Sequence, residues 1–230
     1  MPAGGKQLNH TTTNQVSVTS RVHLLTQMAF LTALMIVMAF TPFGYIPLPF
    51  MNATTMHIPV IIGACLLGPK TGALLGAIFG ITSVVKATIQ PNLTSFVFTP
   101  FYSFSPQFHG GIESLIVAIV PRILIGLIAG CLFSLLKKKK KSLSFSLLIS
   151  GFAGSMVNTV GVMTLIYLLF GEQYAMAGGT DPSMLFGVIM GIVGLNGIPE
   201  ALIAAILTQA VGRALFVVKN HSGGTIKSAV

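Results

Sequence analysis

Apolar residues gather in six stretches along the chain, and proline, glycine or charged residues separate one stretch from the next. A helix that crosses a bilayer needs about 20 mainly apolar residues. The pattern therefore predicts an all-α integral membrane protein with six transmembrane helices. The predicted helices cover residues 22–41, 57–69, 71–88, 112–136, 143–170 and 183–216. The second helix is short, roughly 20 Å at 1.5 Å per residue, so its neighbours must help it to span.

Polar tails flank this membrane domain, which we expect to cover residues 22–218. Residues 1–21 are polar and lack periodicity, which predicts a flexible tail, and residues 219–230 form a second tail. The apolar run from Val22 to Phe40 is longer than the core of a typical signal peptide and lacks a clear cleavage site of small residues. We therefore interpret this run as a retained membrane helix.

The positive charges outside the helices predict the orientation, because cytoplasmic loops carry an excess of Lys and Arg. With a cytoplasmic N-terminus, the cytoplasmic set is Lys6, Arg21, Lys70, Lys137–Lys141, Lys219 and Lys227. The loops 42–56, 89–111 and 171–182 then face the outside, and they contain no Lys or Arg. Both termini are therefore expected on the cytoplasmic side.

The composition excludes an ordinary soluble protein. Only 7% of the residues are charged, whereas a soluble domain carries about 25%. The formal net charge of +9 could suggest a nucleic-acid partner. We reject that interpretation, because five of the thirteen positive residues form the single run Lys137–Lys141 between apolar stretches. Cys65 and Cys131 both lie in apolar segments, and their spacing indicates no metal site.

The stretch Gly68-Pro69-Lys70-Thr71 looks like the end of a phosphate-binding loop. Such a loop follows a strand and opens a helix of a soluble α/β unit. Here the preceding run is a membrane segment, so we interpret Lys70 as the boundary residue of a tight turn between two helices. The chain therefore has no visible ATPase, and uphill transport would take its energy from a partner or from an ion gradient.

Small residues recur at a spacing of four, which lets helix backbones approach closely in a membrane. Three such faces are Gly72/Gly76/Gly80, Gly126/Gly130 and Gly187/Gly191. Packing inside the helix bundle is the expected role of most of them.

Few polar side chains lie inside the apolar spans, and a charge there is costly unless it faces a partner or a water-filled cavity. They are Lys86, Arg122, Asn158, Asn196 and Glu200. If they share one outward-facing pocket, its charges sum to about +1, which suits a small monoanion. The alternatives are that Lys86 extends to the outer interface, that Arg122 and Glu200 form a structural pair, and that the asparagines only bridge helices.

Two outer loops and one helix break adjoin this predicted pocket. The cluster Asn52-Ala53-Thr54-Thr55-Met56-His57 is polar, and Thr94–Phe108 is rich in aromatic residues, which is typical of either a lid or an aromatic belt at the lipid interface. Pro199 removes a backbone donor within Asn196–Glu200. A break there would line a substrate site, as in transporters, or be a simple kink.

These features resemble a known family. The short second helix HIPVIIGACLLGPKTGALLG, the PRILIG of the fourth helix and Ala29-x-x-x-Ala33 of the first are similar to the substrate-binding S components of energy-coupling factor (ECF) transporters. NATTMHIPVIIGA together with TSFVFTPF is most similar to the pantothenate-specific branch. The resemblance covers residues 22 to 218.

The resemblance implies a vitamin-binding subunit of the bacterial plasma membrane that is not an enzyme and holds no cofactor. ATP would be bound by two cytoplasmic ATPases, which act with a membrane T component. Ala29 and Ala33 match the family's docking motif for that component. The outer loops would act as a gate, through Thr54, Thr55, His57, Phe98 and Tyr102. Lys86 or Arg122 would hold the vitamin carboxylate, with Asn158, Asn196 and Asn52 for its polar remainder and Glu200 beside them.

Other functions stay open at this point. A proton-coupled secondary transporter of a small anion would use Glu200 as its titrating group, although no internal repeat supports that class. An S component for another vitamin, such as folate or a pyridoxine-type compound, would keep the fold and change the pocket. A membrane enzyme is disfavoured, because H-E-x-x-H is absent and no nucleophile–base pair is visible.

Overall fold

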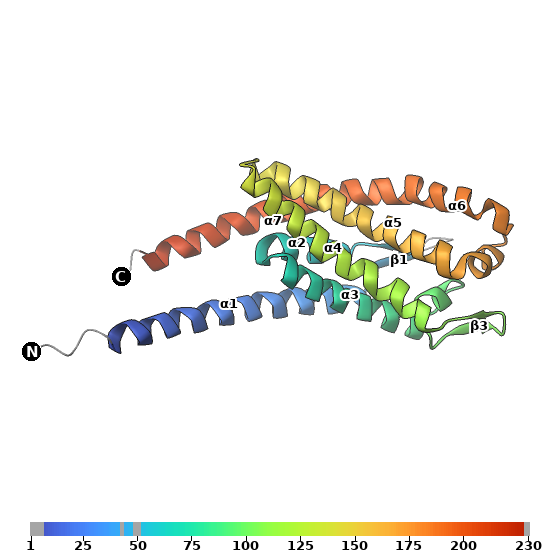
Figure 1. Cartoon of the computed structure of the whole chain (residues 1–230), viewed down its shortest axis with the longest axis horizontal. Coiled ribbons are helices and arrows are strands. Elements are labelled where there is room, and N and C mark those ends of the chain that lie inside the picture. Colours follow the sequence, from blue (N-terminus) through green and yellow to red (C-terminus); the bar gives the residue numbers. More distant parts are fainter. Residues whose placement is uncertain (1–6, 42–43, 48–51, 228–230) are drawn as a thin grey trace, which may run out of the picture.

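The computed structural model describes residues 7–41, 44–47 and 52–227. Within these, side chains are described for 21–41, 44–45, 54–103 and 105–218. The fold is a long bundle of helices with two small hairpins toward one end (Figure 1).

In the described part of the chain, seven α-helices form the bundle. They are α1 (Gln7–Ala39), α2 (His57–Leu67), α3 (Pro69–Ile89), α4 (Ile112–Lys138), α5 (Leu143–Ala177), α6 (Leu185–Ile192) and α7 (Ile198–Lys227). A π-helical turn, η3 (Val193–Gly197), joins α6 to α7. Five stretches are long and apolar enough to cross a membrane: Arg21–Ala39, Pro69–Ile89, Ile112–Lys138, Leu143–Ala177 and Pro182–Val218. With the shorter α2 they correspond to the six predicted segments.

The all-α fold class is confirmed, and the outer loops add two short hairpins that were not predicted. Each of two outer loops contains a short antiparallel hairpin, β1 (Tyr45–Pro47) with β2 (Asn52–Thr54), and β3 (Ser103–Ser105) with β4 (Phe108–His109). Strands of two or three residues are too short to show the alternation of apolar and polar positions from which strands are predicted.

Several helix ends also differ from their predicted positions. The helix α1 begins at Gln7, before the expected 22, because neither proline nor glycine interrupts the sequence between Gln7 and Ala39. The helix α7 likewise runs to Lys227, beyond 216. The helix α5 continues past 170, but its dihedral angles leave the helical range at Phe170, where the segment was expected to end. The mobility of the two tails stays a prediction.

The short helix α2 lies at the centre of the bundle. It contacts α1, α3, α4, α5 and α7, and each residue from His57 to Cys65 is buried. Around it, α3 packs against α4, α4 against α5, and α5 against α7. Eleven residues therefore suffice for α2, because its neighbours cover it on all sides.

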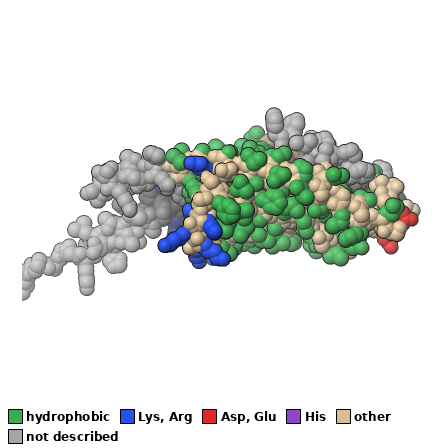
Figure 2. Space-filling view, turned by 90° about the horizontal axis from the view of Figure 1, so that it is seen from above, with side chains coloured by type: hydrophobic (Ala, Val, Ile, Leu, Met, Phe, Trp, Pro, Cys, Tyr) green, Lys and Arg blue, Asp and Glu red, His purple; other side chains and the backbone are tan. Residues whose placement is uncertain are grey.

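Positively and negatively charged side chains gather at opposite ends of the molecular surface. In Figure 2 the Lys and Arg side chains gather at one end of the apolar surface, and the Asp and Glu side chains lie at the opposite end. The turn between α4 and α5 carries Lys137–Lys141, all exposed, and Lys140 has a positive φ of 56°. Ser142 then begins α5 by accepting a hydrogen bond from the Phe145 N–H at 3.2 Å. Both chain ends lie toward this lysine-rich turn (Figure 1).

Candidate functional site

A pocket opens between the helices near the two hairpins. Its empty volume is about 640 Å³, which includes the open solvent at its mouth. The lining residues come from α3, α4, α5, α7 and the two outer loops: Tyr45, Thr54, Ser83, Lys86, Ala87, Gln90, Ser95, Phe98, Arg122, Asn158, Thr159, Val162 and Glu200.

Arg122 supplies a buried positive charge to this pocket. Its side chain is only 5% exposed, and its Nη1 donates to the Val117 carbonyl at 2.7 Å. That carbonyl lies four residues before Pro121, which has no N–H, so the regular helical hydrogen bond to it is missing. The proline in α4 thus frees the backbone acceptor that fixes the neighbouring arginine.

Two aromatic rings hold the same guanidinium. The Arg122 Cζ lies 5.5 Å from the ring centroid of Phe79 and 5.3 Å from that of Phe98, both within the range of cation–π attraction. Its Nε has no hydrogen-bond partner among the described residues. No carboxylate of the described residues lies within 4.0 Å of Arg122. The charge is therefore available to a ligand, which argues against a structural pair of Arg122 with Glu200.

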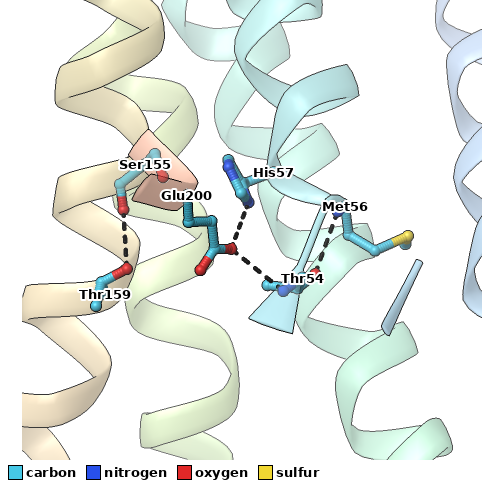
Figure 3. A network of polar contacts seen from close by, with 6 residues as sticks. All are labelled: Thr54, Met56, His57, Ser155, Thr159 and Glu200. Atoms are coloured by element: carbon cyan, nitrogen blue, oxygen red, sulfur yellow. Dashed lines mark hydrogen bonds and ion pairs between the residues drawn. The ribbon is translucent and has the colours of Figure 1, made fainter. Parts of the chain in front are cut away.

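Glu200 makes its contacts with the first outer loop instead (Figure 3). Its Oε1 accepts a hydrogen bond from the Thr54 N–H at 3.2 Å and lies 3.5 Å from His57 Nδ1. Thr54 ends β2 and His57 begins α2. One carboxylate on α7 thus meets the segment that joins the first hairpin to the central helix.

The α5 wall of the pocket contributes neutral polar groups. Asn158 is 5% exposed, and its Oδ1 has no hydrogen-bond partner among the described residues. The Thr159 hydroxyl next to it donates to the Ser155 carbonyl at 3.4 Å (Figure 3). A buried acceptor without a partner is unfavourable, so Asn158 is suited to receive a hydrogen bond from a ligand.

The α3 wall carries a second cation and a hydroxyl pair. Lys86 is partly buried and its Nζ donates to Gln90 Oε1 one turn further along. The Tyr45 hydroxyl and Ser83 Oγ are 3.0 Å apart, which ties β1 to α3. Lys86 therefore lies at the pocket and has a partner of its own, unlike the Arg122 Nε.

The aromatic side chains of the loop 89–111 lie in several different environments. Phe98 lines the pocket, whereas Phe96 is fully buried and packs edge-on against Phe170 at 6.0 Å between ring centroids. Tyr102 packs at the edge of the same apolar cluster, and Phe101 is 76% exposed. Phe98 thus lines the pocket and Phe101 faces outward, and the lid and the aromatic belt both stay predictions.

The structure brings most of the predicted site residues together. Lys86, Arg122, Asn158 and Glu200 line one pocket, and so do Thr54 and Phe98 from the predicted gate. His57 is buried next to Glu200, and the Thr55 N–H donates to the Gly44 carbonyl at 3.2 Å.

The predicted residues Asn196, Ala29 and Ala33 lie elsewhere, and the side chain of Asn52 is not described. Asn196 lies in η3 and is not among the lining residues. Asn52 lies in β2, and its side chain is outside the described residues. Ala29 and Ala33 are exposed on α1, away from the pocket, next to the exposed Phe30. Their docking role stays a prediction.

Sequence reasoning missed several lining residues. They are Tyr45, Ser83, Ala87, Gln90, Ser95, Thr159 and Val162. Ser83 and Gln90 precede and follow Lys86 by about one helical turn, and Val162 follows Asn158 by one turn, so helical spacing from the predicted residues would have found these three. Tyr45 and Ser95 are loop residues, whose position no periodic pattern indicates.

Fold and pocket together define a multi-pass membrane protein that holds a small ligand near one end of its helix bundle. Residues 23–212 match the family model described as "ECF transporter, substrate-specific component". The chain therefore belongs to the family of substrate-specific components of ECF transporters, and it is a protein of the bacterial cell membrane.

Two curated relatives are similar over most of their length. The chain is 36% identical over 194 residues to the pantothenic acid transporter PanT of Lactococcus lactis subsp. cremoris, covering 84% of this chain and 93% of that protein. It is 31% identical over 204 residues to the pantothenate transporter PanT of Leuconostoc mesenteroides subsp. mesenteroides, covering 84% and 92%.

Proposed function

We propose that this chain captures pantothenate from outside the cell and delivers it inward with a T component and two ATPases. The names of both similar transporters support the choice of vitamin. The observation that carries the proposal is the Arg122 guanidinium, which is buried at the pocket without a carboxylate partner among the described residues. Such a group favours an anionic ligand, because the ligand's charge would compensate a buried cation.

Within this proposal Arg122 binds the carboxylate of pantothenate, and Lys86 lines the pocket wall. The Arg122 Nε lacks a hydrogen-bond partner, whereas Lys86 already donates to Gln90. Pantothenate also has two hydroxyls and an amide. Asn158 Oδ1, which has no partner among the described residues, is suited to accept from one of them.

The orientation in the membrane follows from the charges. The exposed Lys137–Lys141 turn lies at the end toward which both chain termini extend, and Glu172 and Asp181 precede α6 near the other end. The positive end faces the cytoplasm by the usual rule. The pocket mouth, which lies beside the outer loops, then faces the outside, and the exposed Ala29 and Ala33 are available to the T component.

Calorimetry on the detergent-purified chain tests the choice of vitamin. We expect binding heat with pantothenate and none with folate or with a pyridoxine-type compound. Heat with one of the others but not with pantothenate would overturn the substrate assignment and leave family membership intact.

A neutral analogue tests the role of Arg122. Pantothenol replaces the carboxylate by an alcohol, so the native chain should bind it at least about tenfold more weakly than pantothenate, as expected for a lost hydrogen bond to a charged group. Arg122→Gln should weaken pantothenate binding and remove most of this preference. Lys86→Gln is the matched control, and it should retain the preference. A preference lost with Lys86→Gln and kept with Arg122→Gln would assign the carboxylate to Lys86.

A further inference from the structure

Glu200 is the one carboxylate among the described residues that line the pocket, and an acidic group is unfavourable beside a bound anion. It does not compensate the pocket's cations by direct pairing, because neither Arg122 nor Lys86 lies within 4.0 Å of it. Its contacts are with the Thr54 N–H and His57 (Figure 3). These contacts indicate another purpose for the acid.

We propose that Glu200 is a positioning residue that holds the β1–β2 hairpin against the pocket and thereby slows the escape of the bound ligand. The proposal rests on the proposed function, since it concerns the same pocket. In this proposal Glu200 keeps the site closed, and Arg122 binds the anion.

The position of Thr54 makes this contact effective. Thr54 pairs with Tyr45 in the hairpin, is buried, and lines the pocket itself. Its hydroxyl accepts from the Met56 N–H at 3.2 Å, and the neighbouring Thr55 N–H donates to the Gly44 carbonyl. These bonds tie the end of β2 to its neighbours, so the bond from Thr54 to Glu200 joins the described part of the hairpin to α7.

The Thr54 amide donates to a carboxyl oxygen where a strand would normally supply a carbonyl. The carboxylate is only 13% exposed, which limits competition from water. A backbone donor that loses such an acceptor in a buried place becomes markedly less protected.

His57 supports the carboxylate from α2. Its ring is fully buried, and neither ring nitrogen has a hydrogen-bond partner among the described residues. The 3.5 Å from Nδ1 to Glu200 Oε1 exceeds ordinary hydrogen-bond length, so the ring packs beside the carboxyl group without a hydrogen bond to it. His57 therefore limits the space open to Glu200, while the Thr54 bond holds the hairpin.

The π-turn η3 helps to direct Glu200 toward the hairpin. Its five residues, Val193–Gly197, directly precede α7, and Glu200 lies in the first turn of that helix. A π-turn contains an additional residue relative to an α-turn, which changes the face on which the following side chains point. The irregularity that Pro199 suggested thus serves to place an acid beside the first loop.

Hydrogen exchange on the ligand-free full chain tests the contact without reference to any vitamin. In Glu200→Ala the Thr54 amide should exchange at least about tenfold faster than in the native chain. Glu200→Gln removes the same charge but keeps an oxygen acceptor, so it should retain most of the protection. Glu172→Ala, which removes an exposed carboxylate, is the matched control and should change nothing at Thr54.

The same exchange data separate a lost contact from a poorly folded variant. Amides of α4 and α5 provide the internal reference, because general unfolding would speed their exchange as well. Faster exchange confined to the first hairpin supports the proposal. Equal effects of the Ala and Gln variants, or unchanged exchange at Thr54 in Glu200→Ala, would overturn it.

Release kinetics complete the test with whichever vitamin the calorimetric panel identifies. Glu200→Ala should release the ligand about tenfold faster, with a smaller change in Glu200→Gln. If pantothenate fails to bind but the exchange pattern holds, only the substrate assignment is wrong. If pantothenate binds and Glu200→Ala releases it at the native rate, the proposal for Glu200 is wrong and the proposed function stands.

Discussion

The seam between α3 and α4 and the helix α6 carry the same spacing of glycines but use it differently. In the seam, a Cβ added to Gly76 would overlap the Arg122 carbonyl, and one added to Gly126 would overlap the Gly72 carbonyl. On α6, a Cβ added to Gly187 or Gly191 would meet no atom within 4 Å. Glycines at intervals of four thus mark a close helix contact only where a second helix is present.

The difference matters because the seam builds the pocket. Gly76 lets α3 approach the backbone of α4 at Arg122, and the ring of Phe79, one turn further along α3, then reaches the guanidinium. Packing inside the bundle was expected for most of the glycine faces, and Gly187 and Gly191 are the face without such a contact in this chain. Their spacing alone did not distinguish them from the seam.

Gly76→Leu should have the largest effect, because the side chain must push α3 and α4 apart. We expect a loss of about 3 kcal/mol in the free energy of unfolding, at the upper end of overpacking costs, together with loss of ligand binding. Thermal denaturation in detergent and calorimetry measure the two effects. Native-like stability and binding in this variant would mean that the α3–α4 contact is not tight.

Pro121→Ala should have the next largest effect, and it changes the α3–α4 seam without adding a larger side chain. Alanine restores an N–H that competes for the Val117 carbonyl, and Arg122 then loses its partner. Helix stability should rise, because proline in a helix interior is about 3 kcal/mol less favourable than alanine. Pantothenate binding should weaken about three- to tenfold, which is less than for the loss of a hydrogen bond to a charged group, because Arg122 is displaced but still present. A variant that is more stable and binds as tightly as the native chain would show that the proline does not position Arg122.

The sequence predicted the helices better than the contacts between them. Length and hydropathy located all six apolar segments. The cost of burying polar groups singled out Lys86, Arg122, Asn158, Asn196 and Glu200, and all of these except Asn196 line one pocket. The hairpins were too short to leave a pattern. The partner of Glu200 was not predictable either, because the Thr54 amide is a backbone group 146 residues away and its availability depends on the loop conformation.

The sequence also did not reveal the Arg122 hydrogen bond, which depends on a backbone hydrogen bond that Pro121 cannot make. The dipeptide Pro121-Arg122 is plain in the sequence, but the consequence for Val117 appears only when the arginine side chain folds back along its own helix. Similarly, Pro199 predicted a break, whereas the chain forms a π-turn and continues as a helix. Sequence rules identify where a helix is weakened, and the surrounding packing decides how it responds.

Gly191→Ala should have the smallest effect and therefore tests the other side of the comparison. The added methyl group meets no atom within 4 Å, so no overpacking cost arises. Alanine favours the helix over glycine by up to about 1 kcal/mol, which should raise the melting temperature slightly and leave ligand binding unchanged. Gly76→Ala is the matched substitution in the seam, where the same methyl group must displace the Arg122 backbone and the melting temperature should fall. Both variants make the same change within a helix, so opposite shifts of the melting temperature would separate the effect of packing from that of helix propensity. Shifts of the same sign would show that the two glycine faces are equivalent.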